Sequence, residues 1–133
     1  MKEVLFVCEG NIGRSQMAEG FYNHFKNSNL ATSAGITDVG EKYNYTPRKD
    51  IVLAMEEKGI DISGQRVKQI TAQMVDEAEK VVVLCDSKLL PAFNRTDIIF
   101  RLVQDPLESS MDGVREVRDS IEKIVQELVD TGE

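Results

Sequence analysis

The sequence predicts an α/β domain built around a parallel sheet. Four short apolar runs alternate with segments whose apolar residues recur at helical spacing. The runs expected to form strands are 3–7, 30–34, 80–85 and 98–103, and the segments expected to form helices are 14–26, 47–58, 71–78 and 113–129. A chain of 133 residues has the length of about one domain and is long enough to bury a core. We therefore expect a single domain over residues 1–133, without repeats or linkers.

The first strand and the first helix have clear local signals. Val4–Val7 is a continuous apolar run rich in β-branched residues, which is typical of a buried strand. Met17, Ala18, Phe21 and Phe25 then recur at helical spacing. The six residues 8–13 between these two elements therefore form a loop that joins the end of a strand to the start of a helix.

The later elements are marked by residues that favour turns, caps and helix ends. Segment 36–46, with a glycine, an asparagine and two tyrosines, is expected to be a loop. Pro47 suits the first turn of the next helix and Gly59 its end, while Thr71 is a candidate cap for a short helix. The last helix has an apolar stripe formed by Val114, Val117, Ile121, Ile124, Val125 and Leu128.

Composition limits the classes of protein to which the chain can belong. It is 41% hydrophobic and 29% charged, as in ordinary soluble globular proteins, and two cysteines are too few for a disulfide scaffold. A net charge of −7 argues against nucleic acid as a partner. The chain runs from Met1 straight into a strand and has no long apolar run, so we expect no signal peptide, no membrane span and a cytoplasmic location.

The loop between the first strand and the first helix predicts an anion site. Cys8 begins it and Arg14 follows six residues later, with Gly10 and Gly13 between them where a positive φ is expected to be needed. Successive backbone N–H groups in such a loop point inward, and the start of a helix adds partial positive charge. The same field favours a thiolate at Cys8. The loop is therefore expected to bind an oxyanion above a nucleophilic sulfur.

The side chains of the loop fit that chemistry. Ser15 can donate a hydrogen bond to the thiolate, and Arg14 can bind two oxyanion oxygens bidentately. The residues expected to bind the oxyanion through backbone amides, joined by the Arg14 side chain, are Glu9, Gly10, Asn11, Ile12, Gly13 and Arg14. The alternative interpretation is a buried structural Cys8 with Arg14 as a solvated surface charge.

These residues also carry a family resemblance. The stretch from Val4 to Gly20, VLFVCEGNIGRSQMAEG, resembles the amino-terminal signature of the low-molecular-weight protein tyrosine phosphatase superfamily, which includes the thiol-dependent arsenate reductases. Further matches lie at 32–35, 59–63, 82–85 and 105–106. The resemblance implies a single three-layer α/β domain. Its four-stranded parallel sheet would have helices on both faces and a phosphatase-type oxyanion loop after the first strand.

Asp105 is the candidate general acid. It precedes Pro106 just past the fourth expected strand, and functional groups gather outside the carboxyl ends of parallel strands. A carboxylic acid there can protonate a leaving oxygen and later activate water. The resemblance places the catalytic aspartate of the family at this position. The alternative is an ordinary Asp-Pro turn.

Asn11 is expected to hold the loop in shape, because its side chain can bond the loop backbone while its own backbone tolerates a positive φ. The resemblance to the arsenate reductases implies a structural cation near Asn11, Glu19, Ser33 and Asp61. A plain hydrogen-bond network is the alternative. No group of residues has the spacing of a catalytic metal site, so none is expected, and His24 is expected at the surface.

Cys85 is the candidate resolving thiol, because it ends the third expected strand at the same sheet edge as Cys8. In the arsenate reductases a cysteine there attacks the first one, and another commonly follows seven residues later. Ala92 occupies that later position, so the relay of three thiols is missing. Either Cys85 resolves directly, or an external thiol does, or Cys85 is a buried apolar residue.

Two activities therefore compete for this chain. Residues 14–19 and 117–119 resemble the arsenate reductases. The chain also departs from the phosphatases at two places: Gly13 stands where they usually have a second loop cysteine, and 107–110 lack the aromatic residues that would hold a phenyl ring. Thiol-dependent arsenate reduction is the first hypothesis, hydrolysis of phosphotyrosine or another phosphomonoester the second, and a non-catalytic oxyanion-binding module the third. No bound cofactor is expected. A reductase would need an external reductant: thioredoxin, glutaredoxin or a low-molecular-weight thiol.

Overall fold

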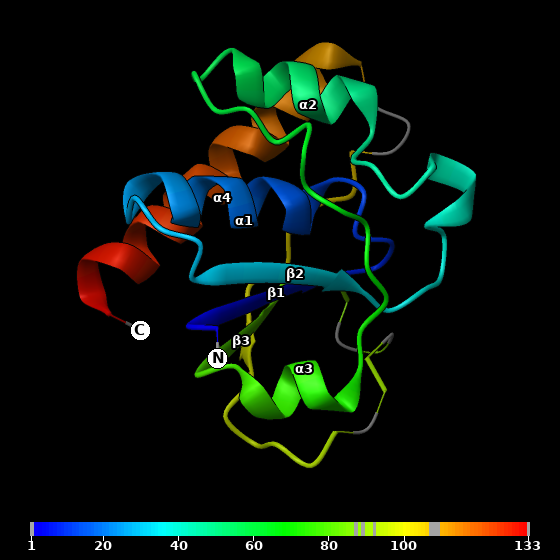
Figure 1. The fold of residues 1–133 in the computed structure, drawn as a ribbon. Coiled ribbons are helices and arrows are strands. Elements are labelled where there is room, and N and C mark those ends of the chain that lie inside the picture. Colours follow the sequence, from blue (N-terminus) through cyan, green and yellow to red (C-terminus); the bar gives the residue numbers. More distant parts are fainter. Residues whose placement is uncertain (1, 87, 89, 92, 107–109, 133) are drawn as a thin grey trace.

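Four parallel strands form one sheet in the order β2-β1-β3-β4 in the computed structural model, which describes residues 2–86, 88, 90–91, 93–106 and 110–132 (Figure 1). The strands are β1 (Val4–Cys8), β2 (Ala31–Gly35), β3 (Lys80–Val83) and β4 (Ile99–Phe100). Central β1 pairs with β2 and β3, so that Val7 lies beside both Ala34 and Val83. The expected four-stranded parallel sheet is confirmed, and the carboxyl ends of its strands meet at one edge.

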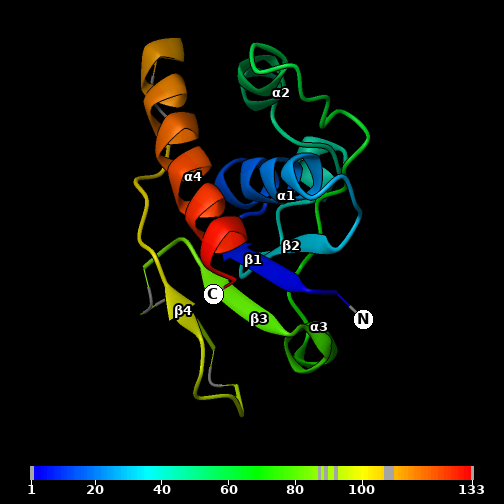
Figure 2. The same ribbon diagram turned by 90° about the vertical axis from the view of Figure 1, so that its left-hand side faces the viewer.

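Helices cover both faces of this sheet, as expected. α1 (Arg14–Phe25) and α4 (Met111–Thr131) lie on one face with α2 (Lys49–Glu56) packed beyond them, and α3 (Ala72–Glu77) lies on the other (Figures 1 and 2). A short 3-10 helix, η1 (Glu41–Tyr43), interrupts the loop predicted at 36–46. Among the described residues, no helix has both the length and the apolar character needed to cross a membrane.

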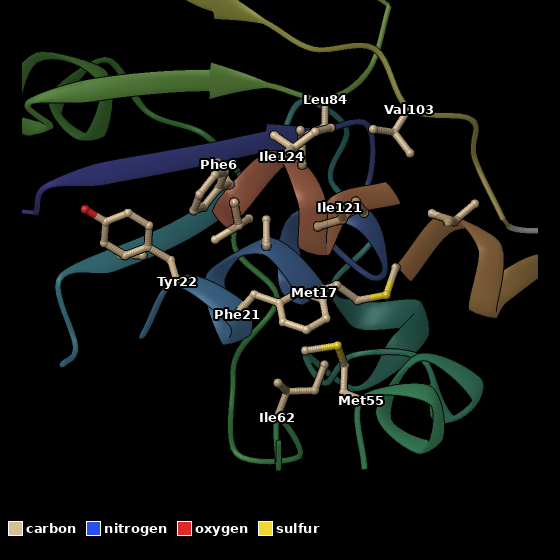
Figure 3. Close-up of a cluster of buried hydrophobic side chains, with 14 of the residues drawn as sticks. Phe6, Met17, Phe21, Tyr22, Met55, Ile62, Leu84, Val103, Ile121 and Ile124 are labelled. Carbon is tan, nitrogen blue, oxygen red and sulfur yellow. The ribbon is translucent and has the colours of Figure 1, made fainter. Parts of the chain in front are cut away.

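Two apolar clusters separate the layers. The larger lies between the sheet and α1, α2 and α4, where Phe6, Met17, Phe21 and Ile121 are fully buried (Figure 3). Burying an apolar side chain of this size stabilises the fold by about 1.5–3 kcal/mol. The smaller cluster lies on the other face of the sheet and contains both cysteines: Leu5, Val7, Cys8, Ala34, Val75, Ala78, Val81, Val83 and Cys85. Cys8 and Cys85 are therefore part of the packed interior.

The observed ends of the strands differ from the expected ones, because pairing with the neighbouring strand decides where each strand ends. β1 and β2 each end one residue later than expected, so Cys8 is the last residue of its strand. β3 ends at Val83 rather than at Cys85, and β4 has only two of the six expected residues. Beyond these strand ends, two backbone hydrogen bonds outside the sheet ladder still connect the two segments. Arg101 N–H donates to Val83 O, and Val103 N–H donates to Leu84 O.

Helix boundaries are decided by caps. Thr71 caps α3 as predicted, since its Oγ1 accepts from Met74 N (3.1 Å). α2 starts after Arg48, whose extended backbone leaves Pro47 outside the helix. α4 begins two residues earlier than expected because Ser110 caps it, accepting from Gly113 N (3.3 Å). Local side-chain bonds thus correct the limits drawn from the apolar stripe alone.

Charged side chains clamp α2 to α4. Glu57 follows α2 and accepts hydrogen bonds from Arg115 (3.0 and 2.9 Å) and from Arg118 Nη1 (2.6 Å). Arg118 is buried and also donates to Ala54 O (3.0 Å). These two guanidinium groups lower the pKa of Glu57 from 4.5 to about 2. The carboxylate is therefore bonded more favourably in the folded chain than in the unfolded one.

We expect Glu57→Gln to lower the free energy of unfolding at pH 7 and to have little effect near pH 2. A pKa lowered by folding stabilises the fold above pH 4.5, and this stabilisation is lost as the pH falls towards 2. Urea unfolding of both proteins at several pH values measures the difference. Glu56→Gln changes the neighbouring exposed carboxylate and is the control. An equal loss at pH 7 and pH 2 would contradict the ion-pair explanation.

Candidate active site

A cavity of about 190 Å³ opens at the carboxyl edge of the sheet, above the end of β1. Four parts of the chain that are distant in sequence line it: Cys8, Glu9, Gly10, Ile12, Gly13, Arg14, Thr37, Val39, Lys42, Tyr43, Arg48, Asp105 and Pro106. Most of the predicted oxyanion loop and Asp105 therefore face the same space. Glu9 is exposed and is one of the acidic residues among the lining side chains.

The loop after β1 is held against the end of β2. Ile36 N–H donates to Cys8 O (3.1 Å), and Thr37 N–H donates to Glu9 O (2.8 Å). A Cβ atom on Gly35 would lie 2.7 Å from the backbone carbon of Gly10, so only glycine fits there. The positive φ expected at Gly10 and Gly13 is instead found at Asn11 (59°), and Gly13 has φ −139°. Asparagine tolerates this conformation better than most residues.

The sulfur of Cys8 lies at the floor of the loop and has polar partners. Asn11 N–H donates to Sγ (3.2 Å), and the hydroxyl of Ser15 lies 2.8 Å from Sγ. Asn11 Nδ2 in turn donates to Ser15 Oγ (2.7 Å). The contact expected between Ser15 and the sulfur is present, and the Asn11 side chain bonds Ser15 Oγ and accepts from Lys68 N–H (2.8 Å).

Arg14 connects the loop to the candidate acid. Its guanidinium is buried, with the residue 6% exposed, and Nη1 donates to Val103 O (2.9 Å). Nη2 lies 3.7 Å from Asp105 Oδ2, and the Asp105 side chain is 44% exposed at the mouth of the cavity. Arg14 is therefore not the solvated surface charge of the alternative interpretation. It lies beside the Asp105 carboxylate and lines the same cavity as Cys8.

Arg48 is a site residue that sequence reasoning missed. Its backbone N–H donates to Ile12 O (3.1 Å), and its Nη2 donates to Pro106 O (3.2 Å), so it joins the oxyanion loop to the Asp-Pro segment. Asp50 orients the guanidinium through two bonds (2.8 and 2.5 Å), and this pairing lowers the pKa of Asp50. A charged residue at the start of a helix has no spacing signal that points to this role.

Tyr43 gives the cavity an aromatic wall. It comes from η1, and Tyr43, Val39 and Pro106 all line the cavity. The sequence-based search for an aromatic residue covered only the segment after Pro106, and Leu107, Glu108 and Ser109 lie outside the described residues. A search for aromatic residues in the loop after β2 would have identified Tyr43.

Cys85 lies in the same buried cluster as Cys8 and is 3% exposed. Both cysteines are free thiols. Burial, followed by the nearby charge of Cys8, raises the pKa of Cys85 to about 11. The two sulfurs therefore have opposite surroundings: Cys8 is hydrogen-bonded and lines the cavity, whereas Cys85 is held in an apolar setting. Ala92, which stands where a third cysteine is common, lies outside the described residues.

The four residues of the implied cation site are hydrogen-bonded to protein groups. Ser33 donates to Glu19 Oε1 (2.7 Å), and the ammonium of Lys68 lies 3.8 Å from the same oxygen. Asp61 is exposed and accepts from Ser63 N (2.9 Å). Within the described part of the chain, no three His, Cys, Asp or Glu side chains gather as a metal site would require. Lys68 thus provides a positive charge beside Glu19, and His24 is exposed as expected.

Several known proteins are similar to this chain over nearly its whole length. A protein of Synechocystis sp. named glutaredoxin arsenate reductase is 37% identical over 133 residues, which is 97% of each chain. An arsenate reductase of Brevibacillus brevis is 32% identical and covers 99% of this chain and 97% of its own. Among solved structures, an arsenate reductase in its phosphate-binding state has a TM-score of 0.79 at 32% identity over 98% of both chains.

A tyrosine phosphatase of Erwinia amylovora shares the fold, with a TM-score of 0.87 over 98% of this chain and 93% of its own at 21% identity. The model of the family described as low molecular weight phosphotyrosine protein phosphatase matches residues 3–132. That match includes the Cys8–Arg14 loop, the Asp-Pro segment and every strand and helix described above. The resemblance inferred from sequence is thereby confirmed: this chain belongs to the low-molecular-weight phosphotyrosine protein phosphatase family.

Proposed function

We propose that this chain is a thiol-dependent arsenate reductase in which Cys8 is the nucleophile. The observation that carries the proposal is the setting of the Cys8 sulfur. It takes a hydrogen bond from Asn11 N–H, lies 2.8 Å from Ser15 Oγ and faces a cavity that Arg14 and Asp105 also line. A charged sulfur beneath convergent donors is suited to attack on a tetrahedral oxyanion. The choice of arsenate is supported by the relatives at 32–37% identity.

The first step joins Cys8 to arsenic. The thiolate attacks arsenic(V), an S–As bond forms and one As–O bond breaks. The leaving oxygen departs as water after taking a proton from Asp105, which lies at the mouth of the cavity beside Arg14. The backbone amides of residues 9–14 and the Arg14 guanidinium offset the charge on the remaining oxygens.

The second step uses a second sulfur. The thiolate of Cys85 attacks the Cys8 sulfur, an S–S bond forms, and the electron pair of the S–As bond passes to arsenic, which leaves as arsenite. Two thiols are thereby oxidised to one disulfide while arsenic(V) is reduced to arsenic(III). This assignment is supported by the burial of both cysteines in one cluster. It also implies a slow step, because Cys85 must lose a proton despite its raised pKa.

The cycle then needs an external reductant. A thiol donor, either a low-molecular-weight thiol or a protein of the thioredoxin or glutaredoxin kind, returns the disulfide to two thiols. A reducing cytoplasm supplies such donors, and it is where we place the protein. The proposed partners are a small oxyanion and this donor, with neither nucleic acid nor membrane involved.

Phosphomonoester hydrolysis is the second candidate function, and the wall formed by Tyr43, Val39 and Pro106 favours it. Arsenate has no organic group that needs an apolar wall, whereas an aryl phosphate does. Its chemistry would begin with the same attack by Cys8 and end with water activated by Asp105. A non-catalytic module would bind oxyanions through the same loop without turning them over.

We expect arsenate reduction in the presence of thiol donors to exceed hydrolysis of an aryl phosphate or of phosphotyrosine. Steady-state assays of both reactions on the same preparation measure the ranking. Cys8→Ser is the control, because it removes the nucleophile and should abolish both turnovers while calorimetry still detects phosphate binding. Phosphotyrosine turnover without arsenite formation would establish the phosphatase, and binding without either turnover the non-catalytic module.

We expect Cys85→Ser to block arsenite release in a single turnover without added thiol, since the second sulfur is absent. In the unmodified protein the same single turnover should speed up as the pH rises from 7 towards 10, because burial raises the pKa of Cys85 and its thiolate fraction therefore grows over this range. Rapid-quench assays with mass spectrometry detect arsenite and the Cys8–Cys85 disulfide. Equal release by the two proteins would show that Cys85 does not supply the second sulfur, and release by Cys85→Ser only after a thiol is added would assign the second step to an external thiol.

We expect Asp105→Asn to slow cleavage of aryl phosphates most when the leaving group is poor. The lost proton transfer is worth about 100-fold or more for phenyl phosphate, and less than about tenfold for an activated nitrophenyl ester. A series of aryl phosphates of graded leaving-group acidity measures the difference. Uniform losses across the series would show that Asp105 has a structural role only.

A further inference from the structure

Gln16 is a polar side chain that is completely buried beside the oxyanion loop, and neither the loop motif nor the proposed chemistry uses it. It is the third residue of α1, and its exposed fraction is 0%. Its Nε2 lies 2.9 Å from Asn11 O, 3.0 Å from Asn11 Oδ1 and 2.9 Å from Arg66 O. Three acceptors from two segments distant in sequence thus share the two protons of one amide group.

The orientation of this amide is determined by its neighbours. All three atoms around Nε2 are carbonyl oxygens, which only accept, so an inverted amide would place oxygen against oxygen. On the other side, Gln65 Nε2 donates to Gln16 Oε1 (2.8 Å) and to Gln16 O (3.0 Å). Gln65 therefore holds Gln16 in the single orientation in which it can donate to Asn11.

The same reasoning extends from Asn11 to the sulfur. Lys68 N–H donates to Asn11 Oδ1 (2.8 Å), which leaves Asn11 Nδ2 to donate to Ser15 Oγ (2.7 Å). The hydroxyl proton of Ser15 is then free to point at Cys8 Sγ, 2.8 Å away, and it donates whenever the sulfur is a thiolate. With Asn11 N–H at 3.2 Å, two donors converge on Sγ. Both depend on the position of Asn11.

We propose that Gln16, oriented by Gln65, is a positioning residue for the nucleophile: it holds Asn11 so that the Asn11 amide and the Ser15 hydroxyl both donate to Cys8. Gln16 bonds the carbonyl and the side-chain oxygen of Asn11, and this clamps a residue whose backbone has a positive φ of 59°. Removing the clamp relaxes both donors away from the sulfur. The inference rests on the proposed role of Cys8 as the nucleophile.

The test is alkylation of Cys8 by iodoacetamide across a range of pH, in the full-length chain, because this readout needs no turnover. Gln16→Met replaces the amide by an apolar side chain of similar length. The loss of about one hydrogen bond to a charged group should raise the pH midpoint of alkylation by about 1 unit, and below that midpoint this is about a tenfold lower rate. Mass spectrometry of the Cys8 peptide, with phosphate protection, assigns the reaction to this cysteine.

Leu128→Ala is the control for general loss of stability, since Leu128 is buried at the opposite edge of the sheet, beside Glu3 and Lys80. It should lower the melting temperature without moving the midpoint. Gln65→Met removes only the group that orients Gln16 and should shift the midpoint in the same direction by less. A folded Gln16→Met with an unchanged midpoint would overturn the proposal, as would an equal shift in Leu128→Ala.

If Gln16→Met does not fold, Gln65→Met decides, and an unchanged midpoint there would again overturn the proposal. Failure of the proposed function has a different signature. A protein that neither reduces arsenate nor hydrolyses phosphate esters would still show alkylation midpoints, and their response to Gln16→Met would still be measured.

Discussion

The candidate site depends on the left-handed backbone of Asn11. That one residue turns its N–H towards the Cys8 sulfur, its Nδ2 towards Ser15 and its Oδ1 towards Lys68 N–H. A positive φ is uncommon outside glycine, so the surroundings must hold it. Gly35 allows the loop to pass close to β2, and Gln16 bonds the Asn11 carbonyl. The position of the sulfur relative to its donors follows from this packing.

The two cysteines show how one fold gives the same side chain two chemistries. Cys8 ends the central strand, where the loop and the start of α1 bring donors to its sulfur. Cys85 follows the neighbouring strand, where burial and the charge of Cys8 raise its pKa to about 11. A hydrogen-bonded sulfur and a thiol with a raised pKa therefore lie at the same sheet edge. The proposed reduction uses this difference, because the first sulfur must be charged at the start and the second only after the adduct has formed.

Local charge at the cavity differs from the charge of the whole chain. The net charge is −7, yet Arg14, Lys42 and Arg48 are among the residues that line the cavity. Arg14 and Arg48 also bond the carbonyls of Val103 and Pro106, one on each side of Asp105. Two arginines thus hold the segment that carries the candidate acid while they make the cavity attractive to an oxyanion. Overall acidity argues against a polyanion as a general partner but not against a small anion bound at this site.

The sequence by itself determined the fold class, the family and the centre of the site. Alternating strand and helix patterns are local, and the Cys8–Arg14 loop carries its chemistry within seven consecutive residues, so both could be predicted without tertiary contacts. Only the tertiary structure decided which distant residues complete the site. Arg48, Tyr43, Gln16 and Gln65 have no motif of their own, and they reach the loop through packing between α1, α2 and the segments that follow β2. The length of β4 and the start of α2 were decided in the same way, because β4 depends on its pairing with β3, and α2 starts after Arg48, whose N–H donates to Ile12 O in the distant loop.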